Sequence, residues 1–496
     1  MAIDPAELRT CLKVLEQAGS LDATDEDSLT LQRAVAKLFK QVKKRRREAA
    51  KQARREADAA VLSTTATANP ARIDDETAGL LVRPVGAAPV ALERGAVATP
   101  QGWAGALYRP QNCYVCKQPY TLVDSFHHQL CPECAADNRA RRDARVDLRG
   151  RRALLTGGRA KIGMYIALKL LRDGADVTIT TRFPRDAVRR FSAVGDSDEW
   201  LSRLHVVGID LRNPVAVADL ADNVAAAGPL DILINNAAQT VRRSPGAYSS
   251  LVDAEAEPLT EAQRGVDLQA LGASADLHPA ALVGGSEGPG FARPGRAGPG
   301  FAGQLAELAM LGGSSSPARV ADGTAVDAGG LIPDLVSHNS WVATVGEVDP
   351  LELLEVQLCN QTAPFILINR LRPALEASTF RRKYVVNVSA MEGVFGRGYK
   401  GPGHPHTNMA KAALNMLTRT AAGELFEHGI LMTAVDTGWI TDERPHSTKS
   451  RLAEEGFHAP LDLVDGAARV YDPIVQGENG VDLYGCFLKD YRPHQW

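Results

Sequence analysis

From Arg152 to Ile234 the chain alternates short apolar segments with helical ones. This apolar periodicity predicts four strands, over 152–156, 176–181, 205–209 and 231–234. A helix that runs through Leu171 follows the first strand, and further helices separate the others. Strands that alternate with helices form a parallel sheet with helices on both faces. The sequence therefore predicts an α/β fold built on a doubly wound parallel sheet.

A glycine-rich turn, 157–163, joins the first strand to the first helix. Gly157 permits a tight turn, and the N-terminus of the helix offers unpaired N–H groups and a positive dipole to a pyrophosphate. A glycine turn alone is weak support, because such turns are common. Its place in a series of alternating strands and helices makes it specific, and the order of elements fits a Rossmann-type sheet.

The length and composition bound the remaining possibilities. The 496 residues exceed the ~150 of an average domain, so we expect at least two folding units. With 45% hydrophobic and 23% charged residues the chain is of globular type. Its net charge of -3 gives no overall preference for polyanions. No apolar run is long enough to cross a membrane and the acidic start does not resemble a secretory signal, so we expect a cytoplasmic protein that does not bind membranes.

The N-terminal region has helical spacing over 6–20 and 25–60. The second stretch carries an apolar stripe and then a block, Lys40 to Glu56, with nine Lys or Arg and two Glu. A solvated or dimerising helix accounts for this block, and a protein or nucleic acid partner is the alternative. We therefore predict a basic helical segment over 1–60 and a linker over 61–105.

Four of the seven cysteines fall within 22 residues, in two C-x-x-C pairs: Cys113, Cys116, Cys131 and Cys134. Each pair presents two thiolates on one turn, and two pairs complete the closed tetrahedron of a structural zinc ion. Reduced buried cysteines or two redox pairs are the alternatives. His127 and His128 lie between the pairs, but four thiolates already satisfy the ion, so we expect surface histidines. A small four-cysteine zinc module is thus predicted over 106–147.

The rest of the chain, 148–496, resembles the short-chain dehydrogenase/reductase family as far as about residue 485. The family's first loop reads T-G-x-x-x-G-x-G, and residues 156–163 read T-G-G-R-A-K-I-G. Five further segments match in order: NNAA from Asn235, LCNQTAPF with Asn360, NVSA at 387–390, NMAKAALNM with Lys411, and DTGWIT at 436–441. The resemblance implies an NAD(P)-dependent oxidoreductase that acts on a small-molecule carbonyl or alcohol, in a homo-oligomer.

The resemblance also implies a dinucleotide site. In this chain its residues are Gly157, Arg159, Lys161, Ile162, Gly163, Arg182, Asp210, Asn236, Ala237 and Lys411. Lys161 stands at the family's second glycine, so either the backbone approaches the cofactor differently or the ammonium meets phosphate. Arg182, with Arg159 nearby, favours the 2'-phosphate of NADP over NAD, unless Arg182 simply faces solvent. Asp210 corresponds to the family residue that meets the adenine.

The catalytic pattern of the family is incomplete here. Of its Asn, Ser, Tyr and Lys, the chain retains Asn360 and Lys411. The tyrosine position holds Thr407, whose hydroxyl is far too weak an acid near pH 7. The serine position holds Ala390, and the neighbouring Ser389 is expected to point to the other side of its strand.

The loop 394–406 offers replacements for the missing acid, in Tyr399, His404 and His406. The alternative is that this loop packs over the site entrance with its histidines exposed. We keep Tyr399 as a candidate catalytic residue, beside Lys411, Asn360 and Thr407.

An insertion separates two of the family segments. The 123 residues between Asn236 and Asn360 are about ninety more than the family uses, and the insertion covers about 244–340. Its Gly/Pro-rich centre cannot bury enough apolar surface to offset the entropy of ordering. Its flanks are expected to line the substrate cleft.

Two functions remain open from the sequence. The first is an atypical NADP(H)-dependent oxidoreductase of unknown substrate. The second is a catalytically reduced dinucleotide-binding scaffold or sensor, whose zinc module and basic helix bind a protein or nucleic acid. The second function explains Ala390 and Thr407 without a replacement acid.

Overall fold

The structure is a computed structural model that describes residues 3–22, 24–69, 72, 102–271, 300–311 and 314–496. Most of the predicted linker and the Gly/Pro-rich centre of the insertion lie outside the described residues. Among the described residues, no helix combines the length and the apolar character that a bilayer span requires.

The body of the molecule is a nine-stranded sheet in the order β11-β10-β9-β8-β6-β3-β4-β5-β7. Its strands are β3 (Arg152–Leu155), β4 (Asp176–Thr181), β5 (Leu204–Gly208), β6 (Ile232–Asn235), β7 (Asp267–Ala270), β8 (Lys383–Ser389), β9 (Ile430–Asp436), β10 (Phe487–Lys489) and β11 (Arg492–His494). Every pairing is parallel except that of β10 with β11. The predicted doubly wound parallel sheet is confirmed, and the strand order reverses at β3 and β6, where such folds form a ligand crevice.

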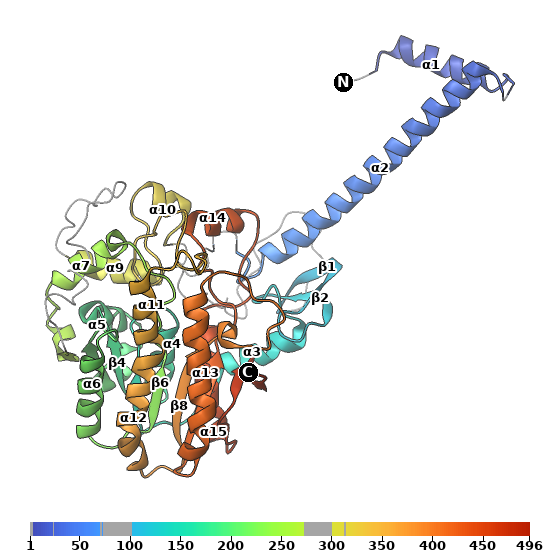
Figure 1. Ribbon diagram of the computed structural model, residues 1–496. Helices are drawn as coiled ribbons and strands as arrows, with labels where there is room; N and C mark the ends of the chain where they lie inside the picture. The colour runs from blue at the N-terminus through green and yellow to red at the C-terminus, as the bar shows by residue number, and fades with distance from the viewer. Residues whose placement is uncertain (1–2, 23, 70–71, 73–101, 272–299, 312–313) are drawn as a thin grey trace.

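Helices cover both faces of this sheet (Figure 1). One face packs on α4 (Lys161–Arg172), α5 (Pro184–Ser192) and α15 (Leu463–Glu478), and the other on α6 (Pro214–Ala226), α12 (Ala363–Glu376) and α13 (Pro405–Phe426). Side chains alternate along β3, since Ala153 and Leu155 join the first core and Leu154 joins the second. A strand buried on both faces explains why this stretch reads as continuously apolar.

The insertion contributes ordered elements of its own. These are α7 (Ser249–Ala256), β7, α9 (Phe301–Met310) and α10 (Pro317–Ala321), and α11 (Pro350–Gln357) with a π-helical turn (Leu358–Thr362) leads back to α12. A separate apolar cluster joins α7 and α9 to Phe183 at the start of α5. Strand β7 extends the main sheet beside β5, which the sequence did not predict. The described part of the insertion is therefore packed onto the sheet domain, next to β5 and α5.

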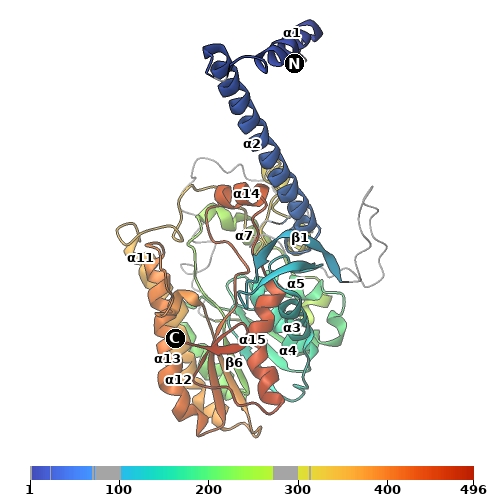
Figure 2. The same ribbon diagram turned by 90° about the vertical axis from the view of Figure 1, so that its right-hand side faces the viewer.

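The N-terminal elements form an arm and a small module. The arm consists of α1 (Pro5–Ala18) and α2 (Glu26–Ser63), close to the predicted helices. Helix α2 has 38 residues, about 57 Å of helix, and projects from the body with α1 at its far end (Figures 1 and 2). The module contains the antiparallel pair β1 (Trp103–Asn112) and β2 (Pro119–Asp124), followed by α3 (Pro132–Asp143). Helix α14 (His446–Glu454) lies between β9 and α15 in the chain.

Candidate functional site

A cleft of about 1340 Å³ opens where the parallel strands end. Its lining comes from the segments that directly follow β3, β4, β5, β6, β8 and β9. The ten residues that the sequence assigned to the dinucleotide all line this cleft, although their role in binding stays a prediction. Of the four candidate catalytic residues, Lys411 and Thr407 line it.

The turn after β3 requires glycine for steric reasons. Gly157 has a φ of +70°, and a Cβ there would lie 2.9 Å from the Cα of Ala237. A Cβ on Gly163 would lie 2.0 Å from the carbonyl oxygen of Gly157. Asn236 holds the turn from β6, because its side-chain amide donates to the carbonyls of Thr156 and Gly157, both at 3.1 Å. The end of β6 therefore fixes the turn that opens toward the N-terminus of α4.

Lys161 is the first residue of α4 and has a φ of +53°, a backbone conformation that residues other than glycine rarely adopt. This conformation explains why glycine suits the position. The Lys161 ammonium lies 3.5 Å from a carboxylate oxygen of Asp327, a buried residue of the insertion. Arg243 lies 4.0 Å from the same oxygen. The insertion thus supplies a negative charge that faces two cations beside the glycine turn.

Three arginines of the cleft lining come from the glycine turn and from the segments after β4 and β5: Arg159, Arg182 and Arg212. Arg182 packs over the ring of Tyr248, 5.2 Å from its centroid, and lines the cleft instead of facing open solvent. Arg159 is held by Asp186 and by the carbonyl of Gly329. Arg182 has no ion pair with any carboxylate in the described part of the chain. Of the two arginines expected to favour a 2'-phosphate, Arg159 is paired with Asp186, whereas Arg182 has no carboxylate within ion-pair distance among the described residues.

Asp210, the expected adenine contact, is paired with Arg212. The guanidinium of Arg212 contacts both carboxylate oxygens of Asp210, at 2.6 Å at the closest, and also reaches Glu355 at 2.7 Å. Burial raises the pKa of Asp210, but the hydrogen bonds and charge of Arg212 outweigh burial and lower it. Asp210 is therefore ionised and held in one orientation.

Lys411, which also lines the cleft, is buried, and its ammonium donates to the carbonyl of Val388 at 2.8 Å. Burial lowers the pKa of Lys411 to about 8. Thr407 lies one turn earlier on α13, buried, and its hydroxyl has no hydrogen-bond partner among the described residues. Ser389 and Ala390 both line the cleft, and the hydroxyl of Ser389 donates to the side-chain oxygen of Asn415 at 2.5 Å. The Ser389 hydroxyl is therefore already engaged by Asn415.

Asn360 is buried in the π-helical turn, outside the cleft lining. It exchanges two hydrogen bonds with the backbone of Gln239, accepting from its N–H at 2.7 Å and donating to its carbonyl at 2.9 Å. Gln239 itself lines the cleft, so Asn360 positions the cleft wall that follows β6.

The loop before α13 does not bring its tyrosine into the cleft. Tyr399 is 77% exposed and is not part of the cleft lining. His404 stacks on Trp341 with ring centroids 4.0 Å apart. His406 is buried, which lowers its pKa, so the alternative of a loop with exposed histidines does not hold for this residue. Its position at the start of α13 places it in the helix packing, which the loop sequence did not reveal.

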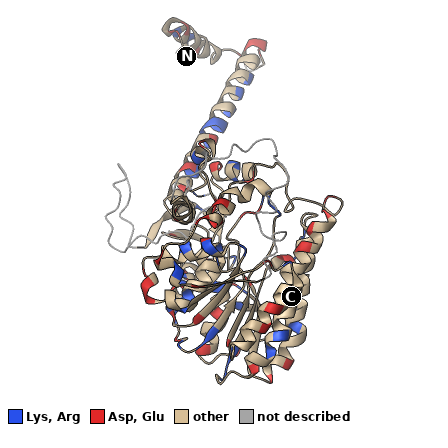
Figure 3. Cartoon of the chain, turned by 90° about the vertical axis from the view of Figure 1, so that its left-hand side faces the viewer, with Lys and Arg blue, Asp and Glu red and all other residues tan. Residues whose placement is uncertain are grey.

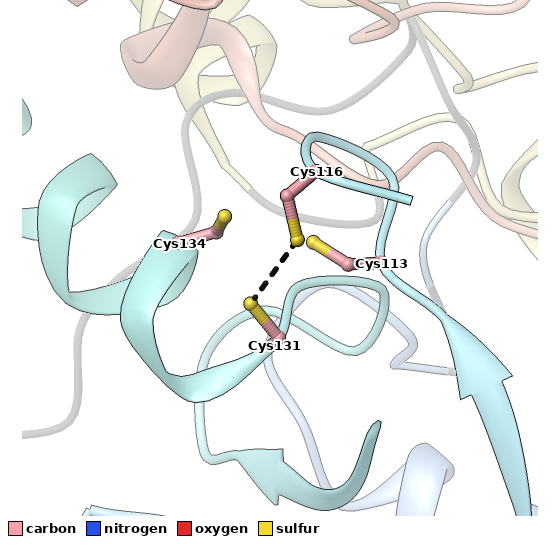
Figure 4. Close-up of side chains that lie close together, drawn as sticks. All are labelled: Cys113, Cys116, Cys131 and Cys134. Atoms are coloured by element: carbon pink, nitrogen blue, oxygen red, sulfur yellow. Dashed lines mark hydrogen bonds between the residues drawn. The ribbon is translucent and has the colours of Figure 1, made fainter. Parts of the chain in front are cut away.

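The four cysteines of the module converge (Figure 4). Their Sγ atoms all lie within 4.8 Å of one another, and those of Cys116 and Cys131 are 3.7 Å apart. A tetrahedral zinc ion with Zn–S bonds of about 2.3 Å needs S···S distances of about 3.8 Å. The geometry and the four sulfur donors therefore fit a closed zinc site.

The two histidines between the cysteine pairs are buried, so the expectation of surface histidines is wrong. His127 Nε2 lies 3.0 Å from Asp465 of α15. Burial lowers the pKa of His127, but Asp465 and Asp124 together outweigh burial and raise it. Arg142 of α3 pairs with Asp462 at 2.6 Å and with Asp465. These contacts dock the module onto the sheet domain, and they involve residues more than 300 positions apart that no local pattern connects.

Sequence reasoning missed that the cysteine module reaches the cleft. Tyr114 and Lys117, from the first C-x-x-C turn, line the cleft together with Trp439. The Tyr114 hydroxyl accepts a hydrogen bond from the backbone N–H of Trp439 at 2.9 Å. Asp436, at the end of β9, was also missed and lines the same cleft. A metal held by this turn would therefore stabilise part of the cleft wall.

A family model described as short chain dehydrogenase matches residues 151–259. The uncharacterized protein R665 of Acanthamoeba polyphaga mimivirus is 31% identical over 380 residues, covering 73% of this chain and 71% of the relative. A probable oxidoreductase of Streptomyces lividans is 40% identical over 95 residues, which cover 18% of this chain and 30% of the relative. The Streptomyces match thus spans less than a third of that protein.

Two solved structures are similar at low sequence identity. One is the NADPH-bound carbonyl reductase from chicken fatty liver, 18% identical with a TM-score of 0.40, covering 70% of this chain and 100% of that one. The other is the carbonyl reductase Sniffer of D. melanogaster, 17% identical with a TM-score of 0.41, with the same coverage.

Proposed function

This chain belongs to the short-chain dehydrogenase/reductase family of oxidoreductases, which use a nicotinamide dinucleotide, and we propose that it uses NADP(H) to interconvert a carbonyl and an alcohol. The observation that carries this proposal is that one cleft contains both the glycine turn and the buried Lys411. The dinucleotide, when bound, supplies or accepts a hydride. The chain's own residues bind it, orient it and handle the proton.

The charge of the cleft supports an anionic ligand. Eleven Lys or Arg and six Asp or Glu side chains line it, although the whole chain has a net charge of -3. A cleft with an excess of positive charge attracts phosphates and raises their local concentration. The pyrophosphate would meet the N-terminus of α4, where backbone N–H groups are unpaired. Arg182 would bind the 2'-phosphate, which favours NADP(H) over NAD(H).

At the reaction end, Lys411 would bind the cofactor and place a positive charge next to the reacting atoms. The Thr407 hydroxyl, which has no hydrogen-bond partner among the described residues, would donate a hydrogen bond to the substrate oxygen. Asn360 would be a positioning residue, because it holds the backbone of the cleft-lining Gln239. Tyr399 is left out of this proposal because it is exposed and outside the cleft lining.

We also propose that the four cysteines hold a structural zinc ion. Their closed sulfur set leaves no open position for a reacting water. The ion would stabilise the turn that carries Tyr114 and Lys117, and would thereby shape one wall of the cleft.

To test which dinucleotide binds, the protein is titrated with NADPH and with NADH, and its fluorescence and the midpoint of its thermal unfolding are measured. We expect saturating NADPH to raise the midpoint by about 5 °C or more and NADH to act more weakly. Turnover of a panel of aldehydes, ketones and alcohols is then measured for the wild type and Lys411→Ala. Loss of turnover in the variant supports the enzyme, with Lys383→Ala, at the opposite end of β8, as the control. No response to either dinucleotide would exclude the proposal.

The exposed arm favours a second function, a scaffold that binds a partner. Residues 40–56 of α2 are almost all exposed and carry the basic block, which lies along the projecting helix (Figure 3). To test this function, Arg45, Arg46 and Arg47 are exchanged for Gln in the full chain, and the affinity of both proteins for a DNA duplex of about 30 base pairs is measured at several salt concentrations. We expect weaker binding and a smaller salt dependence if the block contacts phosphates. Binding that is equal in both proteins would exclude nucleic acid as the partner of this block.

A further inference from the structure

The proposed function leaves one group unassigned, the acid that protonates the substrate oxygen. The inference below rests on that function. Asp436 is the last residue of β9 and lines the cleft, yet only 5% of its surface is exposed. In the parallel pairing of β8 with β9 its register partner is Ser389, the residue before the vacant serine position. Strand register therefore places a carboxyl group at the reaction end.

Two buried ionisable side chains contact the backbone on either side of Ala390. Asp436 accepts a hydrogen bond from the backbone N–H of Met391 at 3.3 Å. The Lys411 ammonium donates to the carbonyl of Val388 at 2.8 Å. A substrate oxygen held near Ala390 would therefore meet an ammonium and a carboxyl group in one pocket.

The charged neighbours of Asp436 come from several elements of the fold. Lys489 Nζ lies 4.0 Å from its carboxylate and also pairs with Asp490 at 2.8 Å. Burial raises the pKa of Asp436 to about 6. The negative charges of Asp490 and Glu392 raise the pKa of Asp436 further, and the positive charges of Lys489 and Arg469 lower it. The charge of Asp436 in turn raises the pKa of Tyr114. Part of the population thus remains protonated near neutral pH, which a proton donor requires.

The other candidate acids fit less well. Thr407 lines the cleft, but a threonine hydroxyl does not release a proton at this pH. Tyr399 is exposed, and neither it nor His406 is part of the cleft lining. Asp436 combines a place in the cleft with an acid of suitable strength.

We propose that Asp436 donates the proton to the substrate carbonyl oxygen, in the role that tyrosine has in the family. As a hydride from the reduced nicotinamide forms a bond to the carbonyl carbon, the π electrons of the C=O bond move to oxygen. That oxygen takes the proton of the Asp436 carboxyl group, so the substrate is reduced to an alcohol and the nicotinamide is oxidised. The resulting carboxylate regains its proton from water. In the oxidation of an alcohol, the Asp436 carboxylate accepts the proton.

The variant Asp436→Asn tests the assignment, because it removes the proton and keeps the shape. Rates are measured with NADPH and two probes, 4-nitrobenzaldehyde and an ortho-quinone. We expect a loss of turnover of about 100-fold or more and an NADPH Kd within twofold of the wild type. Glu255→Gln is the matched control, since Glu255 is a buried acid of α7 whose pKa burial also raises and which does not line the cleft. We expect this control to change turnover by less than threefold.

Two pH measurements separate a proton donor from a structural residue. Reduction by the wild type is expected to fall tenfold per unit above pH 6, as Asp436 loses its proton, and Asp436→Asn should lack this limb. Asp436→Glu should retain it at a lower rate. Because the folded pKa lies above the unfolded one, the ionised group costs stability as the pH rises from about 4 to about 6. Asp436→Asn should therefore have a higher thermal midpoint at pH 7.5 and an unchanged one at pH 4.

The outcomes distinguish this inference from the function on which it rests. Asp436→Asn with full turnover and an unchanged pH profile would overturn the assignment. A wild type that binds NADPH but reduces neither probe would also overturn it, while the binding part of the proposed function would stand. A wild type that fails to bind NADPH would overturn both.

Discussion

The two ends of the cleft differ in how far they depart from the family pattern. At the dinucleotide end, Gly157, Gly163 and Asn236 remain, because a side chain at either glycine would collide with backbone or Cα atoms. At the reaction end, Ala390 and Thr407 have replaced two reactive side chains, and the fold tolerates both. A position where any side chain would collide with the backbone accepts little besides glycine. A proton donor, in contrast, can be supplied by a residue on a neighbouring strand.

The largest effect is expected from Gly163→Ala at the dinucleotide end. Its Cβ would lie 2.0 Å from the carbonyl oxygen of Gly157, so the turn has to shift. We expect a loss of NADPH affinity of at least about 100-fold, roughly 3 kcal/mol, measured by fluorescence titration. The control is Gly423→Ala on α13, where the added Cβ meets nothing within 4 Å and alanine favours the helix. Unchanged NADPH affinity in Gly163→Ala would show that this turn does not bind the dinucleotide.

The metal module should affect the reaction end more than the dinucleotide end. In Cys131→Ser we expect loss of the bound zinc, measured by elemental analysis, and a loss of at least about 2 kcal/mol in the free energy of unfolding. Because the Tyr114 hydroxyl accepts a hydrogen bond from the backbone of Trp439 in the cleft wall, turnover should fall more than NADPH affinity. Cys11→Ser, on the exposed helix α1, is the control. Purified wild type with no zinc, and with stability unaffected by Cys131→Ser, would rule out the metal site.

A third prediction concerns the choice between NADP(H) and NAD(H) at the dinucleotide end. Arg182→Ala is expected to weaken NADPH binding by about 10- to 100-fold, because it removes a charge-assisted hydrogen bond to the 2'-phosphate. NADH affinity should stay within about threefold, since NADH lacks that phosphate. Arg172→Ala removes the same charge from the far end of α4 and serves as the control. Equal losses for both dinucleotides would assign Arg182 a structural role instead.

The smallest effect is expected at Lys161, where the dinucleotide end departs from the family. Lys161→Gly relieves a positive φ that costs about 1 kcal/mol and removes the ion pair with Asp327. These changes oppose each other, so we expect NADPH affinity to change by about threefold or less. Asp327→Asn, which keeps Lys161, separates the two contributions. A tenfold loss in Lys161→Gly alone would mean that the ammonium binds phosphate directly.

Apolar periodicity and cysteine spacing predicted the features that depend only on residues close together in the sequence. The strands and helices around β3 and β6 lie where the apolar periodicity placed them, because side-chain spacing along one segment decides them. The cysteine spacing also indicated convergence, since each pair shares one turn. The expectation that failed concerns burial: His127 and His128 were expected at the surface, because nothing near them in the sequence shows what packs over them.

The amino-acid sequence by itself determined the α/β class, the turn that lacks side chains and the four-cysteine cluster. The tertiary structure decided the contacts between distant segments: His127 on Asp465, Asp327 against Lys161, and Tyr114 in the cleft wall. It also decided that Asp436 faces the segment around Ala390, since strand register aligns residues that lie far apart in the chain. The physical reason is that periodicity and turn chemistry act over a few residues, whereas register, docking and burial depend on how the whole chain packs.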